Sequence, residues 1–85
     1  MQETRQYRGI SKRLAADYLG NLGGERVDGD DRLEGGGWSA ALSAETVNAG
    51  GSIRLTEVTV EFEGETAVLE ELVEDFTRKA MRAGG

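Results

Sequence analysis

The sequence predicts a single α+β domain spanning residues 1–85. An antiparallel, curved sheet of three to four strands carries two helices on one face, in the order β-α-β-β-β-α. Three observations predict this fold. The chain has 85 residues, the length of one domain. Apolar residues alternate along two segments and recur at helical spacing along two others. No connection after the first helix requires a long crossover, which favours antiparallel pairing.

The first part of the chain predicts a strand followed by a helix. Residues 3–9 form a weak strand, because Tyr7 is its only large apolar side chain. Ser11 suits a helix N-cap, since its hydroxyl can accept a hydrogen bond from a free backbone N–H. Helical spacing then predicts an apolar face made of Leu14, Ala15, Tyr18, Leu19 and Leu22. Gly23-Gly24 ends the helix, since glycine adopts the left-handed conformation without steric cost.

The middle of the chain predicts one poorly marked strand and one clear strand. Residues 25–36 indicate a short strand or strand-like arm with a turn, anchored by Val27 and Leu33. From residue 38 onward, apolar and polar side chains alternate, which predicts a strand with one buried face. The residues that we expect on this face are Trp38, Ala40, Leu42 and Ala44.

After a turn at residues 48–51, residues 52–63 predict the strongest strand, but its alternation changes phase. Ile53 and Leu55 occupy odd positions, whereas the later apolar residues occupy even ones: Val58, Val60 and Phe62. A regular strand cannot direct both sets to the same face. We therefore expect a bulge or bend near Thr56-Glu57. The alternative is a two-sided strand whose odd residues are covered by another element.

The last element predicted is a helix over residues 66–82. Its apolar residues follow helical spacing: Leu69, Leu72, Val73, Phe76 and Ala80. Acidic residues in its early turns and basic residues in its last turn complement the helix dipole. Gly84-Gly85 closes the helix. A terminal Gly-Gly is also the feature of ubiquitin-like sulfur carriers, whose tail must be extended. The helical residues directly before it favour a helix end.

The composition excludes most catalytic chemistry. The chain has no His, no Cys and no Pro, so imidazole and thiolate catalysis, disulfides and zinc-finger sites are excluded. Serines lack a histidine base, and the paired carboxylates fall on solvated faces, where their pKa values would not separate. An acidic loop at residues 28–31 fails the EF-hand pattern, because Leu33 and Ser39 occupy its glycine and glutamate positions. We therefore expect no enzyme activity, no cofactor and no metal.

The net charge of −6 is unevenly distributed. Seven of the ten basic residues lie near the two chain ends, whereas fifteen of the sixteen acids lie between them. Intramolecular attraction explains this pattern, and a basic binding patch where the ends meet is the functional alternative. The candidate binding residues are Arg5, Tyr7, Arg8, Lys12, Arg13, Trp38, Arg78, Lys79 and Arg82. Trp38 belongs to the core on its strand phase, and would be a binding anchor if exposed.

Several glycine–aromatic groups carry a resemblance to a known family. They are Tyr7-Arg8-Gly9-Ile10-Ser11, Leu22-Gly23-Gly24, Gly36-Gly37-Trp38, Phe62-Glu63-Gly64 and the closing Arg78–Gly85 run. The chain resembles a small (halo)archaeal α+β family. It also resembles the C-terminal domain that follows the ubiquitin-like part in some proteins related to the molybdopterin synthase small subunit. The resemblance implies a small α+β domain linked to molybdopterin or sulfur-transfer proteins, and carries over no catalytic residues.

The leading hypothesis is a non-catalytic, cytoplasmic binding or accessory module with a protein partner, existing as a monomer or weak homodimer. A sulfur carrier or modifier acting through Gly85 is the alternative. Nucleic-acid binding is the third hypothesis, and the overall negative charge argues against it. The many Asp and Glu residues with only two Lys are typical of halophilic archaea. No run of apolar residues is long enough to span a membrane.

Overall fold

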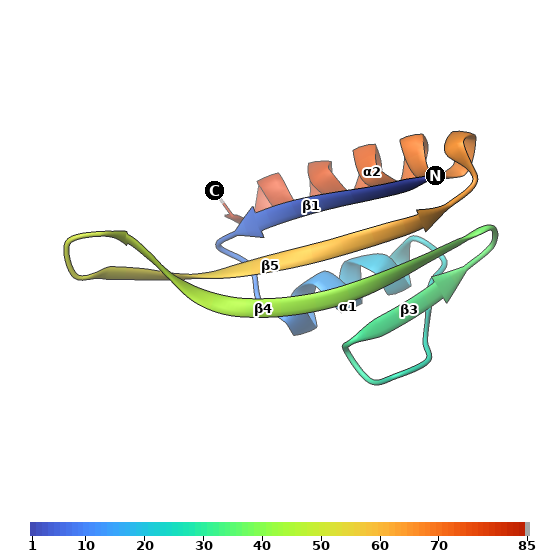
Figure 1. Ribbon diagram of the computed structural model, residues 1–85. Coiled ribbons are helices and arrows are strands. Elements are labelled where there is room, and N and C mark those ends of the chain that lie inside the picture. The colour runs from blue at the N-terminus through green and yellow to red at the C-terminus, as the bar shows by residue number, and fades with distance from the viewer. Residues whose placement is uncertain (85) are drawn as a thin grey trace.

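The computed structural model describes residues 1–84 as two helices and a five-stranded antiparallel sheet (Figure 1). The strand order is β1-β5-β4-β3-β2, and all four neighbouring pairs are antiparallel. The α+β class and the antiparallel pairing are therefore confirmed. The elements are β1 (Gln2–Arg8), α1 (Lys12–Asn21), β2 (Glu25–Arg26), β3 (Arg32–Gly35), β4 (Trp38–Gly50), β5 (Ile53–Gly64) and α2 (Thr66–Gly84).

The prediction of three to four strands was wrong, because residues 25–36 contain two strands. The segment reverses direction at an acidic turn in which Gly29 has a φ of 57°. The two residues of β2 then pair with Leu33 and Glu34 of β3. A strand of two residues is too short to show alternation, so the sequence pattern could not reveal it.

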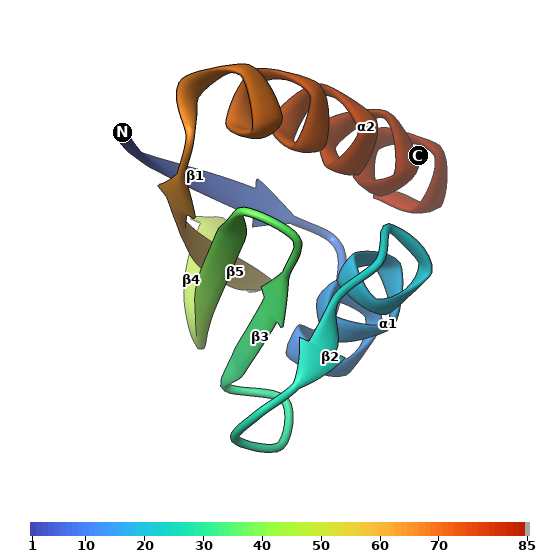
Figure 2. The ribbon, with the colours of Figure 1, turned by 90° about the vertical axis from the view of Figure 1, so that its right-hand side faces the viewer.

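Both helices pack against the concave side of the sheet, as Figure 2 shows. Even-numbered residues of β4 and β5 face the helices, so that the helices and the sheet share one core. Phe76 of α2 lies at its centre and contacts Tyr7 and Phe62 edge-on, with ring centroids 4.9 and 5.8 Å away. The buried apolar residues are Ile10, Ala15, Ala16, Leu19, Leu33, Trp38, Ala40, Leu42, Val58, Val60, Phe62, Leu69, Leu72, Val73, Phe76 and Ala80.

The ends of α1 follow the predicted signals. Ser11 is the N-cap, and its Oγ accepts a hydrogen bond from the Leu14 N–H at 3.0 Å. Gly23, with a φ of 101°, follows the helix. Its N–H donates to the Gly20 carbonyl, so the last turn is closed by a backbone bond. Both predicted boundary signals are confirmed.

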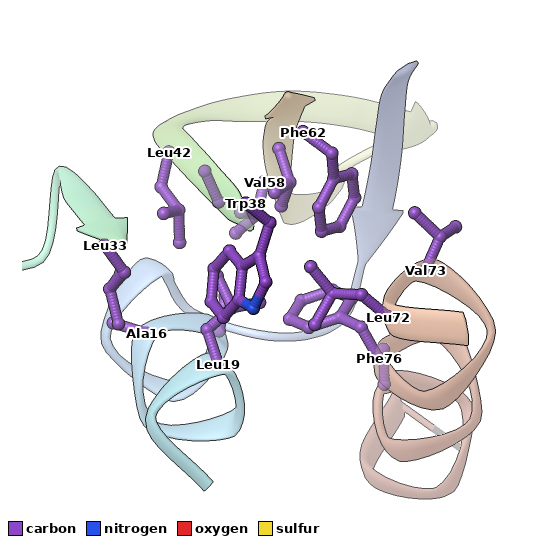
Figure 3. Close-up of a cluster of buried hydrophobic side chains, with 14 of the residues drawn as sticks. Ala16, Leu19, Leu33, Trp38, Leu42, Val58, Phe62, Leu72, Val73 and Phe76 are labelled. Carbon is purple, nitrogen blue, oxygen red and sulfur yellow. The ribbon is translucent and has the colours of Figure 1, made fainter. Parts of the chain in front are cut away.

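Trp38 is a core residue held between two glycines. Its side chain points into the space between the sheet and the helices, beside Leu19 and Leu72 (Figure 3). A Cβ atom added at Gly35 would lie 2.2 Å from the indole, and one at Gly24 would lie 2.7 Å away. These glycines therefore provide the space that the ring occupies. The core role expected from the strand phase is confirmed.

Beyond the helices, β4 and β5 continue as a two-stranded hairpin, which gives the domain a long axis of 42 Å (Figure 1). We call residues 45–57 the arm. The β4·β5 register is unbroken from Trp38↔Gly64 to Asn48↔Arg54. The predicted bulge at Thr56-Glu57 was therefore wrong, and the only register shift in this ladder lies between Asn48 and Gly50, near the arm's tip.

Because the register is regular, the phase change is real, and the strand is two-sided. Ile53 and Leu55 lie on the outer face, opposite to the core, and are 60% and 37% exposed. The alternative prediction of a two-sided strand is confirmed. Its second part, that another element covers Ile53 and Leu55, is not confirmed by any described element. Ala44, which we expected to be buried, is exposed next to the start of the arm, although its register partner Val58 is buried.

Candidate interaction surface

The structure brings the basic ends of the chain to the same end of the molecule. The last residue of β1, the start of α1 and the last turns of α2 all lie there (Figure 1). A hydrogen bond of 2.8 Å between the Tyr7 and Thr77 hydroxyls joins β1 to α2. The arm projects from this same end (Figure 1).

Four of the seven cations of the predicted patch are engaged with acids. The pairs are Arg5–Glu3 (2.6 Å), Arg8–Glu57 (2.9 Å), Arg78–Glu74 (3.0 Å) with Arg78–Asp75 (3.2 Å), and Lys12–Asp31. The hydrogen bond to Asp31 raises the pKa of Lys12. Exposed pairs of this kind contribute little stability. They do neutralise much of the positive charge, which favours intramolecular attraction over a basic patch.

The remaining three cations lie on the two helices. Arg13 on α1 and Arg82 on α2 are exposed, and Lys79 is partly buried. None of the three forms an ion pair within the described residues. They are the cations of the predicted patch that a partner could contact without displacing an acid of this chain.

Neither aromatic residue of the predicted patch is presented for stacking. The Tyr7 ring packs edge-on against Phe76, and burial raises the pKa of its hydroxyl above 10.0. Trp38 is only 8% exposed. Trp38 is therefore not an exposed binding anchor, and Tyr7 links β1 to α2.

Glu57 is a buried carboxylate that sequence reasoning missed. It is 8% exposed and is the only buried charged residue among those described. Its Oε2 accepts a hydrogen bond from Arg8 Nε at 2.9 Å. The two residues are register partners on β5 and β1, at the root of the arm. The pairing depends on sheet register, which no sequence pattern revealed. Glu57 thus anchors the arm to the end of β1.

Several shallow hollows lie outside the core, of which three are lined by residues of the sheet and helices described above. One of about 160 Å³ lies on the outer face of the sheet and is lined mainly by polar residues. One of about 200 Å³ lies beside Trp38 and Leu72, with Glu71 and Asp75 among its lining residues. The third, of about 350 Å³, lies between β1 and α2. None of them brings a nucleophile together with a base.

The arm is the exposed apolar surface that the sequence analysis did not identify as functional. Ile53 and Leu55 lie on its outer face, and Val47 is the register partner of Leu55. Arg54 is the only charged residue among residues 46–56. The phase change at residues 55–58 was the signal, because it placed large apolar side chains on a face that the helices cannot cover.

The archaeal MoaD-like protein family matches residues 3–85 of this chain. The chain belongs to this family. The match confirms the resemblance to a small archaeal family related to the molybdopterin synthase small subunit. No curated protein matches this MoaD-like chain. Within residues 1–84, none of its helices has the length and apolar character needed to cross a membrane.

The closing glycines of this MoaD-like chain fall partly within the structure. The helix α2 continues through Gly84, so this residue is not part of an extended tail. Gly85, the residue of the sulfur-carrier hypothesis, lies outside the described residues. The first two described elements are a strand and a helix, and the last is a helix.

Proposed function

We propose that this archaeal MoaD-like chain is a non-catalytic binding module that contacts a protein partner through its arm. We further propose an accessory role linked to molybdopterin or sulfur-transfer proteins. The observation that carries the proposal is the arm itself, a two-stranded hairpin whose outer face exposes Ile53 and Leu55.

Two physical arguments support a partner on the arm. An isolated two-stranded hairpin is marginally stable in water, and beyond its root beside β1 the arm has no other described strand or helix next to it. Burial of apolar surface contributes about 25 cal/mol per Å². On the outer face of the arm, Ile53 and Leu55 still leave 60% and 37% of their surface in water. A partner that covers Val47, Ile53 and Leu55 buries the apolar surface that a single chain leaves exposed.

The chemistry of the side chains supports a non-catalytic role. The sequence contains no imidazole or thiol. The one buried carboxylate, Glu57, accepts a hydrogen bond from Arg8 and does not stand alone in an apolar pocket.

The test compares two exposed apolar sites in tagged protein purified from a native host. The double variant Ile53→Ser/Leu55→Ser alters the arm. The control Val27→Ser alters a residue that is 51% exposed in the turn between β2 and β3. We expect a defined partner to co-purify with wild type and the control and to be lost from the arm variant. Equal recovery of that partner by all three proteins would overturn the proposal.

A sulfur carrier is the second candidate, and the match to a MoaD-like family favours it. It requires Gly85 to carry a terminal carboxylate that is converted to a thiocarboxylate. Intact-mass measurement of protein from a native host tests it, because sulfur replaces one oxygen. An unmodified mass in cells that are actively making the cofactor would reject this candidate. The helical conformation of Gly84 counts against it.

A further inference from the structure

The described sheet has four free edges, and one of them is more open to another strand than the others. The edge along β1 carries Glu3, Arg5 and Arg8, and charged side chains block edge-to-edge pairing. The edge at β2 is two residues long. The third edge is that of β4 along the arm, residues 43–50, where Glu45 is the only charged residue. The fourth edge is that of β5 along the arm, which is only three residues long, 53–55, and carries Arg54.

This third edge directs unpaired backbone groups outward. Pairing with the preceding segment ends at Leu42, whose N–H donates to the Asp31 carbonyl at 2.8 Å. Successive residues of a strand alternate the direction of their N–H and C=O groups. Ala44 and Thr46 therefore point theirs the same way as Leu42, to an edge where no described strand lies, and Asn48 does so at the end of the regular ladder.

We propose that the occupant of this edge is a second copy of the chain, whose β4 pairs antiparallel with the first about a twofold axis through Val47. This inference rests on the proposed function, because pairing two arms joins their outer faces into one larger apolar surface for the protein partner. A twofold axis perpendicular to the sheet keeps each outer face on the same side. Val47 then lies opposite Val47 of the second copy, and each is already the register partner of its own Leu55. The result is a row of four apolar side chains across four strands.

Charge favours a second copy in this register. Each copy carries a net charge of −6, so most surfaces of two copies repel each other. Residues 46–56, by contrast, contain a single charged residue, Arg54. With the axis at Val47, Glu45 lies opposite Ala49, so the two Glu45 carboxylates do not meet. Like charges directly opposite each other would destabilise the pair.

Geometry also permits the pairing. The arms overlap side by side, and each body lies beyond the far end of the other arm, because the strands run antiparallel. Eight residues of strand span about 27 Å, so the bodies remain apart. The same surface patch is used on both copies, as closed twofold symmetry requires.

The absence of cysteine from the chain makes a direct test possible, since Val47→Cys introduces a single thiol. In this register residue 47 forms a non-hydrogen-bonded pair, in which the two Cα atoms lie about 4.5 Å apart, within disulfide reach. We expect Val47→Cys to form a disulfide-linked dimer in air at least about tenfold faster than the control Val27→Cys, since only paired arms hold two thiols together. Equal rates, or faster linkage of Thr46→Cys, would overturn the proposal.

Sedimentation equilibrium provides a second measurement that does not depend on thiols. We expect wild type and Val27→Glu to dimerise, and Val47→Glu to dimerise at least about tenfold more weakly, because it places two carboxylates face to face. Far-ultraviolet circular dichroism of the same samples checks that each variant is folded. A monomeric wild type overturns this inference alone, while the co-purification experiment still decides the proposed function.

Discussion

The two halves of the β4–β5 hairpin use the same strands in different environments. In the body, the inward side chains are covered by α1 and α2, and Val58, Val60 and Phe62 are at most 1% exposed. At the boundary with the arm, Ala44 has the same strand phase but is exposed, and in the arm the large apolar residues lie on the other face. The strand pairing is continuous throughout. Burial in this domain is therefore decided by where the helices end, not by where the strands end.

The phase change marks the boundary between these two regions. A bulge was the expected cause, because a bulge lets one face of a strand change places with the other. The regular register at Thr56-Glu57 excludes that cause. Instead, apolar residues change face where helical cover is lost, and this pattern indicates a second contact surface. Substitutions in the covered body should therefore cost far more stability than substitutions in the uncovered arm.

The largest effect is expected at the centre of the body. Phe76→Ala removes a fully buried ring that contacts Tyr7, Tyr18 and Phe62. We expect a loss of about 3–5 kcal/mol in the free energy of unfolding, measured by urea denaturation. Met81→Ala is the matched control on the same helix, because Met81 is 69% exposed. Similar losses in both variants would contradict the assignment of the core.

The helices and the core could be predicted from the sequence, because their signals are local. Ser11, Gly23 and the helical spacing of Leu69 to Ala80 act through neighbours a few residues away. The alternation after Trp38 likewise identified the buried face as far as Leu42. These features do not depend on how the rest of the chain folds.

The remaining features depend on contacts between distant segments. The two-residue β2 exists only because β3 lies beside it. The burial of Glu57 results from its register with Arg8, 49 positions away. The seven terminal cations were correctly noted as a charge pattern, but Arg8 and Lys12 meet acids 49 and 19 positions away, which only the fold brings close. The sequence therefore pointed to the basic ends as the candidate interaction surface, whereas the structure points to the arm.

A second prediction concerns the glycine beside Trp38. Gly35→Ala places a Cβ 2.2 Å from the indole, so the ring must move, and we expect a loss of about 1–3 kcal/mol. Gly36→Ala is the control, because no atom lies within 4 Å of its Cβ. Denaturation followed by tryptophan fluorescence measures both the stability and the environment of the ring. We expect a red-shifted emission for Gly35→Ala and not for Gly36→Ala. Unchanged stability of Gly35→Ala would show that the Trp38 ring is not tightly packed against Gly35.

A third prediction concerns pH and Tyr7. Burial raises the pKa of its hydroxyl above 10.0, so the unfolded chain loses this proton at a lower pH than the folded domain does. The contribution to stability is complete below pH 10 and is lost as the pH rises through the folded pKa. Tyr7→Phe removes this dependence and also the hydrogen bond to Thr77, at a cost of about 1 kcal/mol. We expect the stability difference between wild type and variant to shrink above pH 10, and a constant difference would contradict the buried hydroxyl.

The smallest effect on stability is expected in the arm. Ile53→Ser replaces a side chain that is 60% exposed and lies on β5, the strand that also carries the fully buried Val60. We expect the free energy of unfolding, measured at low protein concentration, to change by less than about 0.5 kcal/mol. Val60→Ala is the matched change in the body, where a buried side chain is truncated and a cavity remains. A loss at Ile53 as large as that at Val60 would mean that the arm is covered within a single chain. If the difference in free energy of unfolding between wild type and Ile53→Ser is small but grows with protein concentration, another molecule covers Ile53.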